Sequence, residues 1–146
     1  MLGYVCKYTP MELFEAMDTE ITRLEPSVTD FNHADTLMHA NICSYTKAVL
    51  EDVMEHDYEG VILTTCCDSI RRLYDTLKSQ FPDKFFFLLD IPRKFNDFAV
   101  TLYERQLKQM LTEYEAFSGK TLDLKRFVSM MQNKAALKKQ ENTRKI

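Results

Sequence analysis

Short apolar runs along the chain predict the strands of a sheet. Residues 85–89 are an unbroken run of phenylalanine and leucine, and residues 61–65 begin with three aliphatic side chains. Runs of this length without polar alternation are typical of strands buried on both faces of a parallel sheet. Two weaker segments, residues 3–7 and 20–24, predict further strands, the second of which is stopped by Pro26.

Between these runs, the apolar positions recur at helical spacing. Thr9 and Glu12 have the spacing of a capping box, which predicts a short helix directly after the first strand. Residues 44–56 predict a second helix. Residues 68–81 predict a third, with Asp68 as its N-cap and an inner face formed by Ile70, Leu73, Leu77 and Phe81.

Two long helices are predicted at the end of the chain. The first spans residues 97–117 and ends at Gly119, a residue suited to the left-handed C-cap position. The second begins near Asp123 and shows no Gly or Pro that would stop it. The apolar side chains that we expect these two helices to bury are Phe98, Leu102, Leu107, Met110, Leu111, Tyr114 and Phe117, followed by Leu124, Phe127, Val128 and Met131.

The alternation of strands and helices predicts an α/β fold. We expect a small parallel sheet flanked by helices, Rossmann-like, with the long helices at the C-terminal end. With 146 residues, of which 45% are hydrophobic, the chain is large enough for one packed core.

Charge and hydropathy exclude two classes of protein. A net charge of −3 argues against nucleic-acid binding. No apolar stretch reaches the roughly 18 residues that a membrane span needs. The N-terminal residues lack a basic region followed by a long apolar stretch, so the sequence predicts no signal peptide and a cytoplasmic location.

The four cysteines are the main candidates for chemistry. In a reducing compartment disulfides are rare, so the thiols call for another explanation. Cys43 directly precedes the helix predicted from residue 44, and Cys67 stands between a predicted strand and the helix after it. A thiolate at a helix N-terminus is stabilised by free backbone N–H groups and the helix dipole. We therefore predict Cys43 and Cys67 as ligands of a metal or cluster.

Other interpretations of these residues stay open. The 24-residue separation of Cys43 and Cys67 matches no short metal-binding signature, and cysteines at strand ends are commonly part of the core. Cys66 is the alternative to Cys67 as a ligand, because adjacent side chains point in different directions and we expect only one of the two to serve. A thiol-based redox or transfer enzyme is a further possibility. Arg71 and Arg72 are candidates for a phosphate contact, although a solvated helix face is the commoner arrangement.

Four segments, in order along the chain, resemble the 2-hydroxyacyl-CoA dehydratase D-component family, which includes benzoyl-CoA reductase subunits. They are residues 3–13 (GYVCKYTPMEL), 41–50 (NICSYTKAVL), 64–75 (TTCCDSIRRLYD) and 90–94 (DIPRK). The second and third segments are similar to the family's cluster-cysteine segments. The resemblance extends from Gly3 to about Gly119.

This resemblance implies that Cys43 and Cys67 ligate a [4Fe–4S] cluster whose third cysteine comes from a second domain that is absent here. It divides the chain into an α/β cluster-binding domain, residues 1–120, and a helical segment, residues 121–146, that leads toward that missing domain. Cys6, Tyr8 and Arg93 follow strands at the same sheet edge, and the resemblance makes them candidate substrate-binding residues.

The resemblance also implies a reaction and its partners. In the complete protein, a lyase removes hydroxide from an acyl-CoA thioester by reductive radical dehydration. An ATP-dependent activator protein with its own iron–sulfur cluster supplies the electron, and a second dehydratase subunit or domain completes the site. We expect the isolated chain to be inactive. The alternative is a non-catalytic α/β interaction module with its cysteines in the core.

Overall fold

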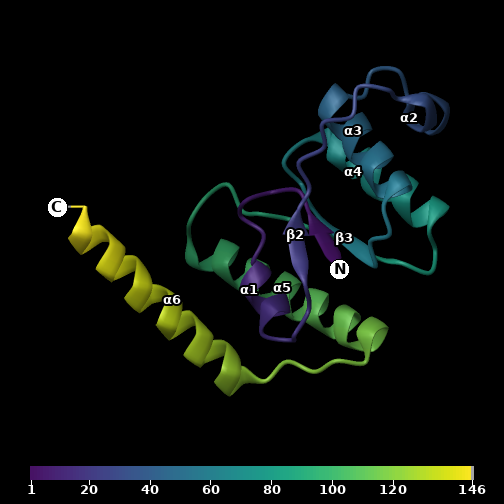
Figure 1. The fold of residues 1–146 in the computed structure, drawn as a ribbon. Helices are drawn as coiled ribbons and strands as arrows, with labels where there is room; N and C mark the ends of the chain where they lie inside the picture. The colour runs from purple at the N-terminus through teal and green to yellow at the C-terminus, as the bar shows by residue number, and fades with distance from the viewer. Residues whose placement is uncertain (146) are drawn as a thin grey trace.

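The computed structural model describes residues 1–145, which form a four-stranded sheet with all strands parallel (Figure 1). The strands lie in the order β2-β1-β3-β4. In the register of the sheet, Leu2 lies opposite Gly60, and Gly60 lies opposite Phe85. The strands are β1 (Leu2–Tyr4), β2 (Ile21–Arg23), β3 (Gly60–Thr64) and β4 (Phe85–Leu89).

Within residues 1–145, six helices accompany the sheet, and the predicted α/β fold is confirmed. They are α1 (Met11–Glu15), α2 (Asn32–Leu37), α3 (Ser44–Glu55), α4 (Asp68–Gln80), α5 (Asp97–Ser118) and α6 (Leu124–Arg144). Strand β4 coincides with its predicted run. Strands β1 and β2 are shorter than predicted, because the chain leaves the sheet soon after Tyr4 and Arg23.

Alternate side chains of the strands point to opposite faces of the sheet, where they belong to two apolar layers. Val61 and Leu63 of β3 face α3 and α4, where they pack with Val49, Leu73 and Leu77. Ile62 faces the opposite layer, which it shares with Phe14 of α1 and with Met110 and Tyr114 of α5. A strand with both faces covered needs apolar residues at every position, which explains the unbroken runs in β3 and β4.

Two predicted helix caps differ in the structure. Pro10, not Thr9, occupies the N-cap position of α1, because a turn from Cys6 to Thr9 holds the Thr9 backbone N–H on the Cys6 carbonyl at 2.9 Å. Cys67 occupies the N-cap position of α4, so Asp68 is the first helical residue rather than the cap. The predicted C-cap of α5 is confirmed, since Gly119 has a φ of 72°.

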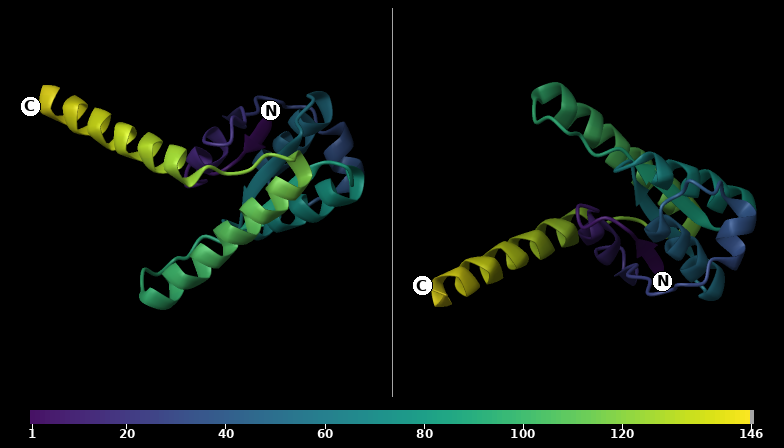
Figure 2. Two further views of the ribbon diagram at one scale, coloured as in Figure 1. Left: turned by 90° about the horizontal axis from the view of Figure 1, so that it is seen from below. Right: turned by 90° about the horizontal axis from the view of Figure 1, so that it is seen from above.

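The long C-terminal helices bury much less than their pattern predicts. In α5, Met110 and Tyr114 are buried, but Phe98 is 73% exposed. No residue of Leu124–Arg144 is buried, and Leu124 is 67% exposed. The physical reason is geometric: a sheet this narrow has too little surface to cover both long helices. Figure 2 shows α5 and α6 diverging from each other and extending beyond the sheet.

Polar contacts and one half-buried side chain hold α6 to the rest of the domain. Phe127 packs against the apolar layer of α1 and α5. Arg126 makes paired hydrogen bonds to the Asp18 carboxylate. Lys134 donates to Glu15 of α1 at 2.7 Å. Ion pairs at the surface contribute little to stability, so α6 is weakly attached. Within residues 1–145, no helix combines the length and the hydropathy needed to cross a bilayer.

Candidate functional site

The strand order creates a crevice between β1 and β3. The chain passes from β1 to β2 on one side and then returns to place β3 on the other side of β1. At such a switch point the loops after the two central strands lead to opposite faces of the sheet, which leaves room for a ligand. Cys6 follows β1, and Cys66 follows β3.

These two thiols line one cavity of about 420 Å³ at that crevice, which we call the cysteine cavity. Tyr8 lines it as well, so two of the three candidate substrate-binding residues, Cys6 and Tyr8, lie together here. The residues that form its walls are Val5, Cys6, Lys7, Tyr8, Arg23, Tyr45, Cys66 and Ile70.

Cys43 occupies the N-cap position of α3, beside this cavity. Its Sγ lies 3.1 Å from the Thr46 hydroxyl oxygen. Partial burial opposes ionisation of the thiol. Hydrogen bonding from Thr46 and Ser69 and from the Tyr45 backbone outweighs it, so the pKa of Cys43 is lowered. The sulfur of an exposed side chain is thus held at a helix N-terminus in surroundings that favour the thiolate.

Cys67 has the corresponding position on the neighbouring helix, as the exposed N-cap of α4. Ser69, two residues further along α4, contributes to the lowered pKa of Cys43. Ser69 also lines one cavity together with Ile42, so the N-termini of α3 and α4 lie near each other.

The Tyr45 hydroxyl is affected by Cys6 and Cys66 of the cysteine cavity and also by Cys43. Burial raises the pKa of its hydroxyl, Arg23 opposes the rise, and charge on Cys66, Cys6 and Cys43 adds to it. Its hydroxyl therefore lies within electrostatic range of three thiols. Within residues 1–145, however, no three His, Cys, Asp or Glu side chains lie close enough together to hold a metal ion.

The cysteines are not core residues. Cys43, Cys66 and Cys67 are exposed, and Cys6 is half-buried. The interpretation of the cysteines as core residues is therefore wrong for three of the four.

Hydrogen bonds hold the loop after β4 to the end of β3 and to α5. Thr65 donates to the Asp90 carboxylate, and the Asp90 backbone exchanges hydrogen bonds with the Gln106 side chain at 2.7 and 3.0 Å. Arg93 lies in this loop but is exposed and does not line the cysteine cavity. Its proposed contact with substrate therefore stays a prediction.

Arg23 and Tyr45 are cavity residues that sequence reasoning missed. A signal for each was present. Arg23 ends β2, whose carboxyl end shares a sheet edge with β1, and Tyr45 is two residues after Cys43. Without the strand order, nothing indicated that β2 lies beside β1 or that the first turn of α3 faces Cys66.

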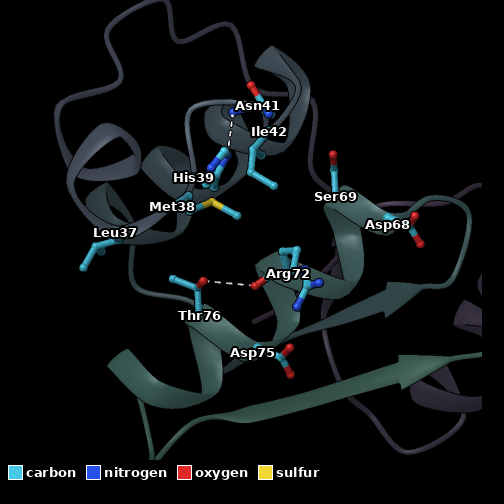
Figure 3. Close-up of a pocket in the computed structure, with 10 residues that line it drawn as sticks. All are labelled: Leu37, Met38, His39, Asn41, Ile42, Asp68, Ser69, Arg72, Asp75 and Thr76. Atoms are coloured by element: carbon cyan, nitrogen blue, oxygen red, sulfur yellow. Dashed lines mark hydrogen bonds between the residues drawn. The ribbon is translucent and has the colours of Figure 1, made fainter.

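Arg72 lies in a different cavity, of about 430 Å³, between α4 and the loop before α3. Figure 3 shows Met38, His39 and Ile42 on one side and Ser69, Arg72 and Thr76 of α4 on the other. Asp68 and Asp75 line it as well, and their negative charges balance Arg72. These carboxylates disfavour the phosphate contact considered for Arg72.

Two buried hydroxyls near the same sheet edge have no partner among the residues described. Thr64, the last residue of β3, is fully buried, and Thr9 is 4% exposed. A buried hydroxyl without a hydrogen bond costs about 1–3 kcal/mol. The carboxyl end of the sheet thus holds unsatisfied polar groups next to exposed thiols.

Comparison with known proteins gives one family. A search of curated proteins found no match. The family model described as 2-hydroxyglutaryl-CoA dehydratase, D-component, matches residues 6–145, nearly the whole chain. The match includes all four cysteines. The chain therefore belongs to the 2-hydroxyglutaryl-CoA dehydratase D-component family.

Proposed function

We propose that the chain is the N-terminal domain, or a truncated relative, of a 2-hydroxyacyl-CoA dehydratase-like iron–sulfur enzyme. In this proposal Cys43 and Cys67 each donate a thiolate to a [4Fe–4S] cluster. The observation that carries it is the pair of exposed cysteines at the N-caps of adjacent helices, in a chain whose family is associated with iron–sulfur clusters.

The residues fit part of such a site. Thiolates are the usual ligands of iron–sulfur clusters, and helix N-termini favour the ionised form. Within residues 1–145, no three His, Cys, Asp or Glu side chains lie close enough together to hold a metal ion, so the two cysteines form only part of the site we propose. We propose that a second domain or a second dehydratase subunit supplies the remaining ligands. A bound cluster would supply a low-potential electron to an acyl-CoA thioester.

The chain's own residues would bind and orient the substrate. Cys6 and Tyr8 line the cysteine cavity, where the Tyr45 hydroxyl and the Arg23 guanidinium offer hydrogen-bond donors to a thioester carbonyl. Arg93 stays in the proposal as a residue of the neighbouring loop. We further propose that an ATP-dependent activator protein delivers the electron. The isolated chain would then be inactive.

Anaerobic reconstitution with iron, sulfide and an excess of a small thiol tests the ligands, since the small thiol can complete the coordination sphere. We expect the chain to retain iron, and expect Cys43→Ala and Cys67→Ala each to lose most of it. Cys66→Ala is the matched control and should retain iron. Because all three side chains are exposed, melting temperatures should stay within about 2 °C of the parent chain.

The opposite pattern would contradict the assignment. Iron binding that survives both Cys43→Ala and Cys67→Ala would exclude a cluster held by these residues. Loss of iron in Cys66→Ala, with Cys67→Ala unaffected, would move the second ligand to Cys66.

A further inference from the structure

A second cavity adjoins the cysteine cavity. It has a volume of about 360 Å³ and lies between the loop after β4 and the first turns of α5. Its walls are largely hydrocarbon and include Ile91, Phe95, Val100 and Tyr103. We call it the apolar cavity. Its size and composition are those of small-molecule pockets in proteins.

Tyr8 joins the two cavities because its side chain lines both. Burial also raises the pKa of Tyr103 in the apolar cavity, and charge on Cys6 in the cysteine cavity adds to the rise. The two cavities therefore meet at Tyr8, and we call the pair of them the groove.

The chemical character changes along this groove. Lys7 and Arg23 line the end near the cysteines. At the other end, the charged residue is Lys94, whose side chain is exposed. An exposed ammonium group attracts a carboxylate only weakly, and moving a carboxylate from water into hydrocarbon walls is costly. The far end therefore suits an uncharged hydrocarbon group.

We propose that the apolar cavity binds the hydrocarbon chain of an acyl substrate whose carbonyl group lies past Tyr8, in the cysteine cavity. It selects neutral acyl chains over chains that end in a carboxylate. Ile91, Val100 and Tyr103 are the residues that determine this specificity. The inference rests on the proposed function, because that function gives the cysteine cavity its reacting carbonyl.

A pair of matched ligands tests the selectivity on the full chain. Hexanamide and adipamic acid share six carbons and a primary amide, and only the second ends in a carboxylate. The amide replaces the thioester, so exposed cysteines are not acylated. We follow the methyl NMR signals of Ile91 and Val100 and expect hexanamide to shift them in a saturable way. Adipamic acid should bind at least about tenfold more weakly.

Two variants test whether hexanamide binds in the apolar cavity. Val100→Glu places a charge in the cavity wall and should abolish the hexanamide shifts at Ile91. Val128→Glu on α6 is the matched control, since Val100 is 44% and Val128 49% exposed, and it should bind normally.

Besides a failure of hexanamide to bind, three results would overturn the inference: equal binding of both amides, unchanged binding by Val100→Glu, or Val100 shifts that depend on protein concentration without ligand. The last would show a contact between copies of the chain. Iron reconstitution tests the proposed function independently of this inference. A chain that holds iron but fails to bind hexanamide keeps the proposed function and loses this inference, and the reverse result removes the cluster while leaving an apolar ligand site.

Discussion

At the amino ends of the strands, polar side chains are paired with one another, whereas at the carboxyl ends they are left open. Tyr114 donates to Glu59 at 2.8 Å and lies 2.9 Å from the Thr19 hydroxyl, which Lys120 contacts at 3.2 Å. This network connects α5, the loops before β2 and β3, and the segment before α6. Burial raises the pKa of Tyr114 to about 12, so its hydroxyl stays protonated and able to donate.

The carboxyl end has the opposite character. Among the residues described, the hydroxyls of Thr9 and Thr64 are buried without partners, and three cysteines are exposed at the starts of α3 and α4. Buried hydroxyls without partners do not stabilise a fold. The amino end therefore stabilises the fold, whereas the carboxyl end is where the proposed site lies.

The largest expected effect is at the amino end of β3. Gly60 lies so close to β4 that a Cβ there would collide with the Phe85 carbonyl oxygen. We expect Gly60→Ala to lower the free energy of unfolding by more than about 3 kcal/mol, measured by urea denaturation. Gly119→Ala is the control. It has a φ of 72° but open space around it, and should cost about 1–2 kcal/mol. Equal costs would contradict the close approach.

The Glu51 carboxylate, between α2 and α3, is buried like the hydroxyls of Thr9 and Thr64, but both of its oxygens have partners. Glu51 accepts from the Ala34 backbone and contacts the His33 ring, each at 2.8 Å. Burial opposes its ionisation, but these hydrogen bonds outweigh burial and lower its pKa. Its contribution to stability is therefore present above the pH at which unfolded glutamate titrates, and is lost as the pH falls through the folded-state pKa.

We expect Glu51→Gln to cost about 1–3 kcal/mol near neutral pH. The difference from the parent chain should shrink as the pH falls below the range in which unfolded glutamate titrates, because Glu51 of the parent then becomes protonated as well. Urea denaturation across this pH range measures both effects. Glu55→Gln, an exposed position on the same helix, is the control and should change stability little at any pH. A constant difference down to low pH would contradict the assignment.

The smallest expected effect compares one hydroxyl from each end of the sheet. Tyr114→Phe removes the donor to Glu59 and should cost about 1–2 kcal/mol. Tyr45→Phe removes a hydroxyl from the cysteine cavity and should stay within about 0.5 kcal/mol. Thermal unfolding of the two variants provides the comparison. A larger loss in Tyr45→Phe would show that the carboxyl end also stabilises the fold.

The sequence by itself determined the order and type of the four strands and of every helix except α2. The unbroken run of β4 and the helical spacing of α4 are local patterns, and local periodicity records which faces of an element are buried. It also placed Cys43 and Cys67 at helix N-termini, because a helix start is visible in neighbouring residues. Membership of the family likewise followed from four segments in order along the chain.

Only the tertiary structure decided which of these residues meet. The strand order put Cys6 and Cys66 in one cavity, brought Arg23 and Tyr45 to it, and left Arg93 outside. It also decided that α6 has no fully buried residue and that only Phe127 of its predicted apolar face packs against the core, although the spacing predicts burial of the whole face. Periodicity shows that a helix has an apolar face, but the size of the sheet decides whether the rest of the chain can cover it.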